Sequence, residues 1–86
     1  MSGPPQSTTF PDSTAISRAA YHPDRRALDV WYRGGDRYTY FDVPLHVYYG
    51  LCAAPSAGEF INRVLKPAYA FEIEPARRRY RPSNDE

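Results

Sequence analysis

Residues 28–44, near the middle of the chain, have the pattern of two strands joined by a glycine turn, LDVWYRGGDRYTYFDVP. Apolar and polar residues alternate before Gly34 and Gly35, and glycine readily adopts the positive φ values of tight hairpin turns. Tyr38 and Tyr40 stand two apart on the second strand, so their rings lie on the same face. This stretch predicts an antiparallel ribbon, which limits the chain to folds that contain a sheet.

The length of the turn decides which residues pair across the ribbon. A three-residue loop places Tyr32 opposite Tyr38 and Val30 opposite Tyr40, with both tyrosines on the apolar face. A two-residue loop places Trp31 opposite Tyr38 and moves both tyrosines to the other face, because a slip of one residue exchanges the faces. We expect the first register because it stacks aromatic on aliphatic side chains across the strands.

Elements on both sides of the ribbon predict an α+β domain. Pro44 suits the first turn of a helix, and Ser56 with Glu59 forms a capping box that begins a second helix, which Pro67 ends. The expected strands are 15–21, 27–33 and 37–41, the first helix is 45–54, and 69–73 is a short final strand or an extended segment. Together they predict a three-stranded antiparallel β-meander followed by two short helices packed on one face.

The 86-residue chain is long enough for one small domain. We expect residues 1–12 to be a disordered N-terminal segment, residues 13–74 to fold, and residues 75–86 to be a polar, disordered tail, basic first and acidic last. With a net charge of +1, nucleic-acid binding must depend on local clusters of cations. No stretch approaches the ~20 apolar residues of a membrane span, and no secretory signal is present, so a cytoplasmic protein is expected.

Several short motifs follow one another in a characteristic order. They are Tyr38-Thr39-Tyr40, Val43-Pro44, an apolar helix with Val47 and Leu51, the segment SAGEFINR at 56–63, and Tyr69. This order resembles the KTSC domain, a short domain named for the C-terminus of some lysyl-tRNA synthetases and also found alone in bacteria. The resemblance implies a domain over roughly residues 13–73, and the synthetase connection suggests RNA binding.

The chain departs from that family's pattern where positive charge is concerned. Lys66-Pro67-Ala68 keeps one cation after the second helix, and Glu72 and Glu74 stand where members tend to continue basic. The density of positive charge in this part of the chain is therefore lower than is typical of a nucleic-acid interface.

The candidate nucleic-acid interface combines basic and aromatic side chains. Its residues are Arg63, Lys66, Asn62, Tyr38, Tyr40, Arg37 and Tyr69. Exposed strand tyrosines stack on bases, but cross-strand core packing is the alternative for Tyr38 and Tyr40. Ser56 and Gly58 at a helix N-terminus are candidates for binding an anion such as phosphate. The alternatives are that Ser56 only caps the helix and that Arg63 only pairs with Glu59.

Trp31 is the candidate for contact with a protein partner or a second copy of the chain. It stands on the face of its strand expected to be solvated, where an exposed tryptophan anchors partners unless a terminus folds over it. His22, His46 and Cys52 lack the spacing of a metal site or a nucleophile, and Cys52 fits an inert buried thiol. The sequence thus predicts no enzyme, cofactor or metal, but a small module that binds RNA or tRNA, or alternatively a protein adaptor or homodimer.

Overall fold

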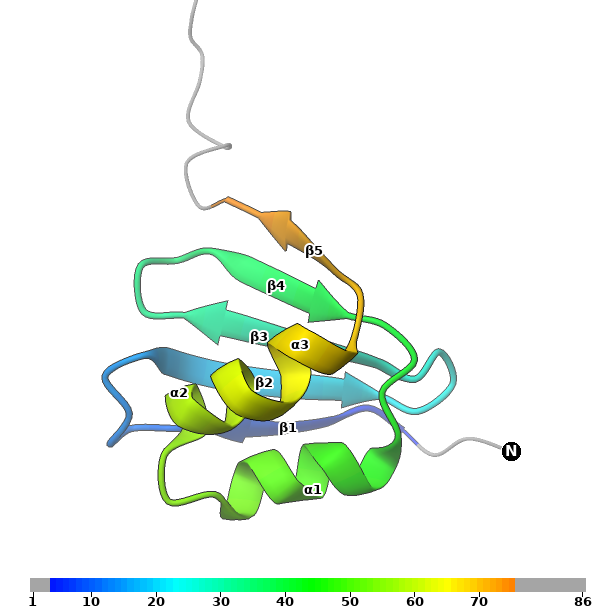
Figure 1. Cartoon of the computed structure of the whole chain (residues 1–86), viewed down its shortest axis with the longest axis horizontal. Coiled ribbons are helices and arrows are strands. Elements are labelled where there is room, and N and C mark those ends of the chain that lie inside the picture. Colours follow the sequence, from blue (N-terminus) through cyan, green and yellow to red (C-terminus); the bar gives the residue numbers. More distant parts are fainter. Residues whose placement is uncertain (1–3, 76–86) are drawn as a thin grey trace, which may run out of the picture.

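The computed structural model describes residues 4–75, in which one antiparallel sheet carries helices on one of its faces (Figure 1). The strands are β1 (Gln6–Thr9), β2 (Ile16–His22), β3 (Ala27–Tyr32), β4 (Arg37–Tyr40) and β5 (Phe71–Glu74), and they lie in the sheet in that order. The helical segments are α1 (Leu45–Ala53), α2 (Ala57–Phe60), the π-helical turn η1 (Ile61–Leu65) and α3 (Lys66–Ala68).

The sheet is larger than the sequence predicts. The three expected strands are confirmed as β2, β3 and β4, and the expected short final strand is β5, which pairs with β4. The expectation of disorder over residues 1–12 is wrong for β1, which pairs antiparallel with β2. Thr8 of β1 also contacts α1, since its Oγ1 lies 2.9 Å from the Tyr48 hydroxyl. The predicted tail beyond residue 75 lies outside the described residues.

The register between β3 and β4 differs from the expected one by two residues. Val30 is paired with Tyr38 and Leu28 with Tyr40, where Tyr32 and Val30 were expected. The loop has three residues as expected, but it begins one residue earlier, since the backbone N–H of Tyr32 donates to the Asp36 carbonyl at 2.8 Å. A shift of two residues preserves the faces, so the prediction that both tyrosines lie on the apolar face is confirmed.

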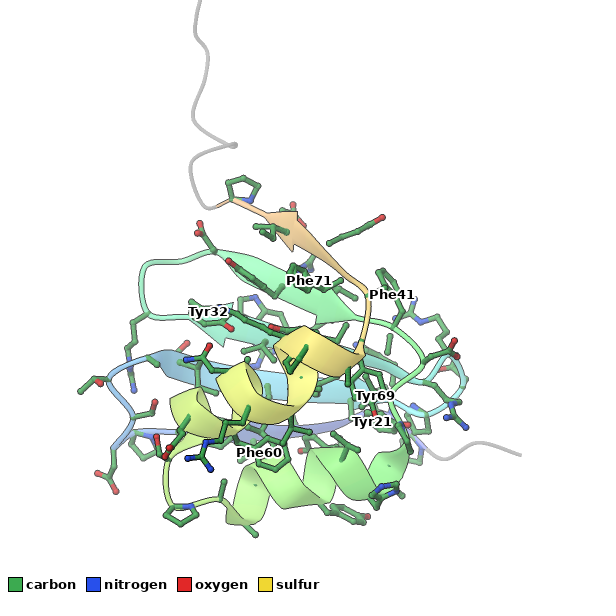
Figure 2. The ribbon with its side chains drawn as sticks, viewed as in Figure 1. Tyr21, Tyr32, Phe41, Phe60, Tyr69 and Phe71 are labelled. Atoms are coloured by element: carbon green, nitrogen blue, oxygen red, sulfur yellow. The ribbon has the colours of Figure 1, made fainter. Side chains whose placement is uncertain are left out.

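The core lies between the sheet and the helices. Its buried residues are Ile16, Ala19, Tyr21, Leu28, Val30, Tyr40, Val43, Val47, Tyr48, Leu51, Ala57, Ile61 and Leu65. Figure 2 shows Tyr21 among the side chains beneath the helices. The hydroxyl of Tyr21 donates to the Val43 carbonyl at 2.5 Å, and this bond ties β2 to the segment that leads into α1.

The second helix begins as expected and ends one residue later than expected. The Ser56 hydroxyl accepts from the Glu59 backbone N–H at 3.3 Å, which confirms the N-terminal cap. The helix continues to Ala68 through the wide turn η1, in which the backbone N–H of Lys66 reaches the Ile61 carbonyl five residues back. A wide turn of this kind makes room for the ring of Pro67, which would otherwise clash with a carbonyl four residues back.

Cys52 is not buried. Its thiol is exposed on α1, with Sγ 3.5 Å from the Thr8 Oγ1 of β1. The expectation of an inert buried thiol is therefore wrong, because Cys52 lies on the side of α1 that faces the edge strand and not the core.

Candidate nucleic-acid interface

One group of predicted residues meets where the helical layer ends over β3 and β4. The Nζ of Lys66 lies 5.6 Å from the centre of the Tyr38 ring and 5.9 Å from that of Tyr32, within the range of cation–π attraction. The two rings contact each other with centroids 4.6 Å apart. We call this group, together with Phe71 and Ile73 of β5, the tyrosine–lysine surface.

This surface is open because β5 extends the sheet beyond the helices (Figures 1 and 2). Phe71 is 37% exposed and Ile73 is 49% exposed, on the same side of the sheet as the helices. The Phe71 ring lies 5.5 Å from that of Tyr38. The result is a connected row of partly exposed aromatic rings with a cation above it.

Tyr40 does not belong to the surface. Its side chain is fully buried, and Phe71 covers its edge with ring centroids 5.3 Å apart. Burial raises the pKa of the Tyr40 phenol far above its usual value, and the hydroxyl of Tyr32, 3.4 Å away, adds to this effect. The stacking role considered for Tyr40 is therefore wrong, and its alternative as a core residue is confirmed.

The remaining helix residues do not converge on one point. Arg63 forms an exposed ion pair with Glu59 at 3.1 Å, which is the structural alternative foreseen for it. Asn62 is exposed one turn before Lys66. Gly58 packs against the Ala15 side chain, so the helix start considered for anion binding lies against the loop before β2.

Arg37 and Tyr69 also lie away from Lys66. Arg37 points to the opposite face of the sheet, where it forms an ion pair with Glu74 of β5. Tyr69 is half-buried and packs against the core (Figure 2). Two predicted residues, Tyr38 and Lys66, thus form the centre of the surface.

The face of the sheet away from the helices is polar and is called here the open sheet face. Arg18, Trp31, Arg37 and Glu74 are successive partners across β2, β3, β4 and β5, so they form one row. The guanidinium carbon of Arg18 lies 4.1 Å from the centre of the Trp31 ring. Trp31 is therefore half-buried under a neighbouring side chain, which weakens the argument that it anchors a partner.

Four residues of these two surfaces were not predicted from the sequence: Arg18, Tyr32, Phe71 and Ile73. Tyr32 was predicted to lie on the apolar face of the sheet, which is correct. The helices do not cover this part of the face, so Tyr32 is partly exposed. The alternation of Phe71, Glu72, Ile73 and Glu74 was a usable signal, because it places both apolar residues on one side of a strand.

The described part of the chain contains neither a metal cluster nor a membrane helix. Within residues 4–75 no three histidine, cysteine or acidic side chains gather as metal ligands would. The helices described in this range are all too short and too polar to cross a bilayer.

Comparison with known proteins identifies the family. The model of the KTSC domain matches residues 12–69. A protein of Tsukamurella paurometabola is 40% identical over 58 residues, which cover 67% of this chain and 87% of that protein. The crystal structure of a KTSC domain protein from Yersinia pestis superposes with a TM-score of 0.71 at 29% identity, covering 79% of this chain and 94% of that one.

A lysine–tRNA ligase of Nostoc contains a similar segment, 32% identical over 62 residues, which cover 72% of this chain. The match spans 11% of the ligase's own length. The chain belongs to the KTSC domain family.

Proposed function

We propose that this KTSC domain is a non-catalytic module that binds RNA through the tyrosine–lysine surface. The observation that carries the proposal is the position of Lys66 above two touching rings, beside the half-exposed Phe71. Aromatic rings stack on unpaired bases of any sequence, and a nearby ammonium group contacts the phosphate backbone.

The charges around the surface support this assignment. Glu72 and Glu74 alternate with the apolar residues of β5, so their carboxylates lie on the open sheet face and not beside Lys66. Arg63 and Asn62 are exposed on the same helical segment and extend the polar rim. With a single cation at its centre, the surface supports weak, sequence-tolerant binding of single strands.

The similarity to a segment of a lysine–tRNA ligase favours tRNA as one probe. A larger protein that already binds an RNA can gain additional contacts from a small module of this kind. A modest affinity of the module for RNA is therefore compatible with the proposed role. The cytoplasmic location expected from the sequence is part of this proposal.

Fluorescence anisotropy tests the proposal with a labelled ten-nucleotide uridine strand and with tRNA, at several salt concentrations. We expect affinity to fall as salt rises, and Lys66→Gln to reduce the slope of log affinity against log salt by about 0.7, one phosphate contact of a single strand. Phe71→Ser should weaken binding by about tenfold through lost stacking. Arg26→Gln is the charge-matched control, because Arg26 is exposed in the turn between β2 and β3.

Salt-insensitive binding, or equal losses in Lys66→Gln and Arg26→Gln, would contradict this assignment. The alternative of a homodimer through Trp31 predicts a concentration-dependent molar mass, which light scattering measures directly. The alternative of a protein adaptor predicts capture of a partner protein from a lysate.

A further inference from the structure

Strand β5 is the last strand of the sheet, and its outer edge faces no other strand among residues 4–75 (Figure 1). All four of its residues are exposed, and the sheet extends beyond the helices here. The backbone N–H and C=O groups along such an edge can pair with an additional strand. The edge of β5 is therefore a place where an extended segment can join the sheet.

The hydrogen bonds between β4 and β5 show which backbone groups point outward. The Phe41 N–H donates to the Ala70 carbonyl at 2.9 Å, and these two residues continue the β4–β5 register by one pair. Hydrogen-bonded and non-hydrogen-bonded pairs alternate along an antiparallel ladder, so Glu72 also directs its N–H and C=O toward β4. Phe71 and Ile73 direct theirs away from β4, to the outer edge.

The side chains of β5 give this edge two different sides. Phe71 and Ile73 are apolar and partly exposed, on the side of the sheet that carries the helices. Glu72 lies on the open sheet face and forms no ion pair within residues 4–75. Glu74, on the same face, is paired with Arg37. A strand that joins the edge therefore meets apolar side chains on one side and the negative charge of Glu72 on the other.

This charge disfavours pairing between two copies of β5. In an antiparallel pairing over the whole strand, Phe71 faces Ile73 of the second copy, and the two Glu72 side chains face each other. Glu72 belongs to a non-hydrogen-bonded pair on this side, in which opposite side chains approach most closely. Like charges directly opposite each other destabilise a sheet, so Glu72 selects against a second copy of this chain.

A cation opposite Glu72 turns this repulsion into attraction. The residues before and after that cation have their side chains on the other side of the added strand, where Phe71 and Ile73 offer apolar contact. In recognition by strand addition, main-chain hydrogen bonds supply affinity and alternate side chains supply specificity. The sequence that matches this edge alternates basic and apolar residues.

We propose that the β5 edge binds an extended segment of a partner protein in which basic and apolar residues alternate. The segment forms backbone hydrogen bonds with Phe71 and Ile73, packs its apolar side chains against theirs, and places a cation opposite Glu72. The edge borders the tyrosine–lysine surface, but its deciding charge lies on the open sheet face, so the proposal does not depend on RNA binding.

Fluorescence anisotropy with the labelled peptide KVKIKVK tests the proposal against two peptides of the same length. EVEIEVE inverts the charges, and KKVVIKK has the same composition without the alternation. We expect KVKIKVK to bind most tightly, and Glu72→Lys to weaken it by about tenfold as attraction becomes repulsion. Asp12→Lys makes the same change of charge in the exposed β1–β2 loop and is the control.

Amide hydrogen exchange locates the bound peptide. Protection should rise more at Phe71 and Ile73, whose N–H groups point outward, than at Glu72, whose N–H points to β4. Ile73→Pro removes one outward N–H and should weaken KVKIKVK more than Ile73→Ser, which removes only the apolar side chain.

Equal binding of KVKIKVK and KKVVIKK would overturn the proposal, because charge alone would then explain the attraction. Equal losses in Glu72→Lys and Asp12→Lys would also contradict it. Protection of Phe71 and Ile73 in the free protein would assign the edge to another part of the chain, or to a second copy if the protection grows with protein concentration.

The two surfaces fail independently. Absence of binding by all three peptides would overturn the strand-addition site and leave the RNA assignment untouched. Loss of RNA binding in Lys66→Gln with normal binding of KVKIKVK, and the converse in Glu72→Lys, would support two separate surfaces.

Discussion

Buried tyrosine hydroxyls at two positions of the sheet have different partners and therefore different energetic roles. Tyr21 donates a short bond to the Val43 carbonyl, whereas the Tyr40 hydroxyl lies 3.4 Å from that of Tyr32, its one hydrogen-bond partner among residues 4–75 and a long contact. Removal of a donor leaves a buried acceptor without a partner, which costs more than removal of a weak contact.

Tyr21→Phe is accordingly expected to lower the free energy of unfolding by about 1–3 kcal/mol, while Tyr40→Phe changes it by less than about 1 kcal/mol. Urea denaturation of both variants measures the difference. Equal losses would show that the Val43 carbonyl finds another donor when Tyr21 lacks its hydroxyl.

The buried phenols also predict how stability depends on pH. Burial raises the pKa values of Tyr40, Tyr32 and Tyr48 above the usual value. The unfolded chain therefore loses these protons at lower pH than the folded chain, so stability is fully present below about pH 10 and falls above it. Tyr40 alone contributes a slope of about 1.4 kcal/mol per pH unit in that range.

Tyr40→Phe should make the alkaline loss of stability shallower, which thermal unfolding from pH 8 to pH 11 measures. If Tyr40→Phe left the slope of stability against pH unchanged, the Tyr40 phenol would have to be accessible to solvent in the folded protein.

At the scale of elements, the start of α2 is fixed by a close approach to the chain before β2. A Cβ at Gly58 would lie 2.9 Å from the Cβ of Ala15, closer than real Cβ contacts allow. Gly58→Ala should therefore cost about 1–3 kcal/mol of unfolding free energy.

Two further variants make that expectation specific. Ala15→Gly combined with Gly58→Ala removes the colliding atom, so the double variant should recover part of the loss, as a double-mutant cycle would reveal. Gly34→Ala is the matched control, because a Cβ there meets nothing within 4 Å and the residue does not have positive φ. A loss in Gly34→Ala equal to that in Gly58→Ala would contradict the steric argument.

Local sequence signals predicted the elements with strong patterns and failed where long-range pairing decides. The alternation at β3 and the cap at Ser56 gave correct elements, because both depend on neighbouring residues. Gln6–Thr9 has no apolar alternation, and its strand depends on pairing with β2. The register of the hairpin also escaped prediction, since Arg33 and Gly34 are both compatible with the first position of the loop.

The candidate site was predictable only in part for the same reason. Lys66 and Tyr38 were chosen by residue type, and the structure brings them together. The motif could not distinguish Tyr40 from Tyr38, because both lie on one face of the strand. They differ in burial: Phe71 and the helices cover Tyr40 and leave Tyr38 partly exposed.

At the scale of the whole molecule, the part matched by the family model is framed by two additional edge strands. The match covers residues 12–69, whereas β1 and β5 lie outside it. β5 covers the edge of β4, and its Phe71 packs on both Tyr38 and Tyr40. The extra strands thus protect an edge that would otherwise expose backbone hydrogen-bonding groups.

A chain that ends at Ala70 should still fold, with a free energy of unfolding about 1–3 kcal/mol lower and a smaller denaturant slope, because less surface is buried. Urea denaturation gives both quantities. We expect the truncated protein to associate at high concentration through the uncovered β4 edge, which light scattering detects. Unchanged stability would show that β5 adds no net packing energy.

The position of Trp31 beneath Arg18 gives the molecule an optical reporter of its own. The chain has one tryptophan, so its tryptophan emission arises wholly from the polar side of the sheet. A ligand that settles near that row would change the colour or brightness of the emitted light, whereas one held above Lys66 is separated from the indole by the thickness of the sheet. Tryptophan fluorescence therefore reports on which face of the protein a given molecule binds.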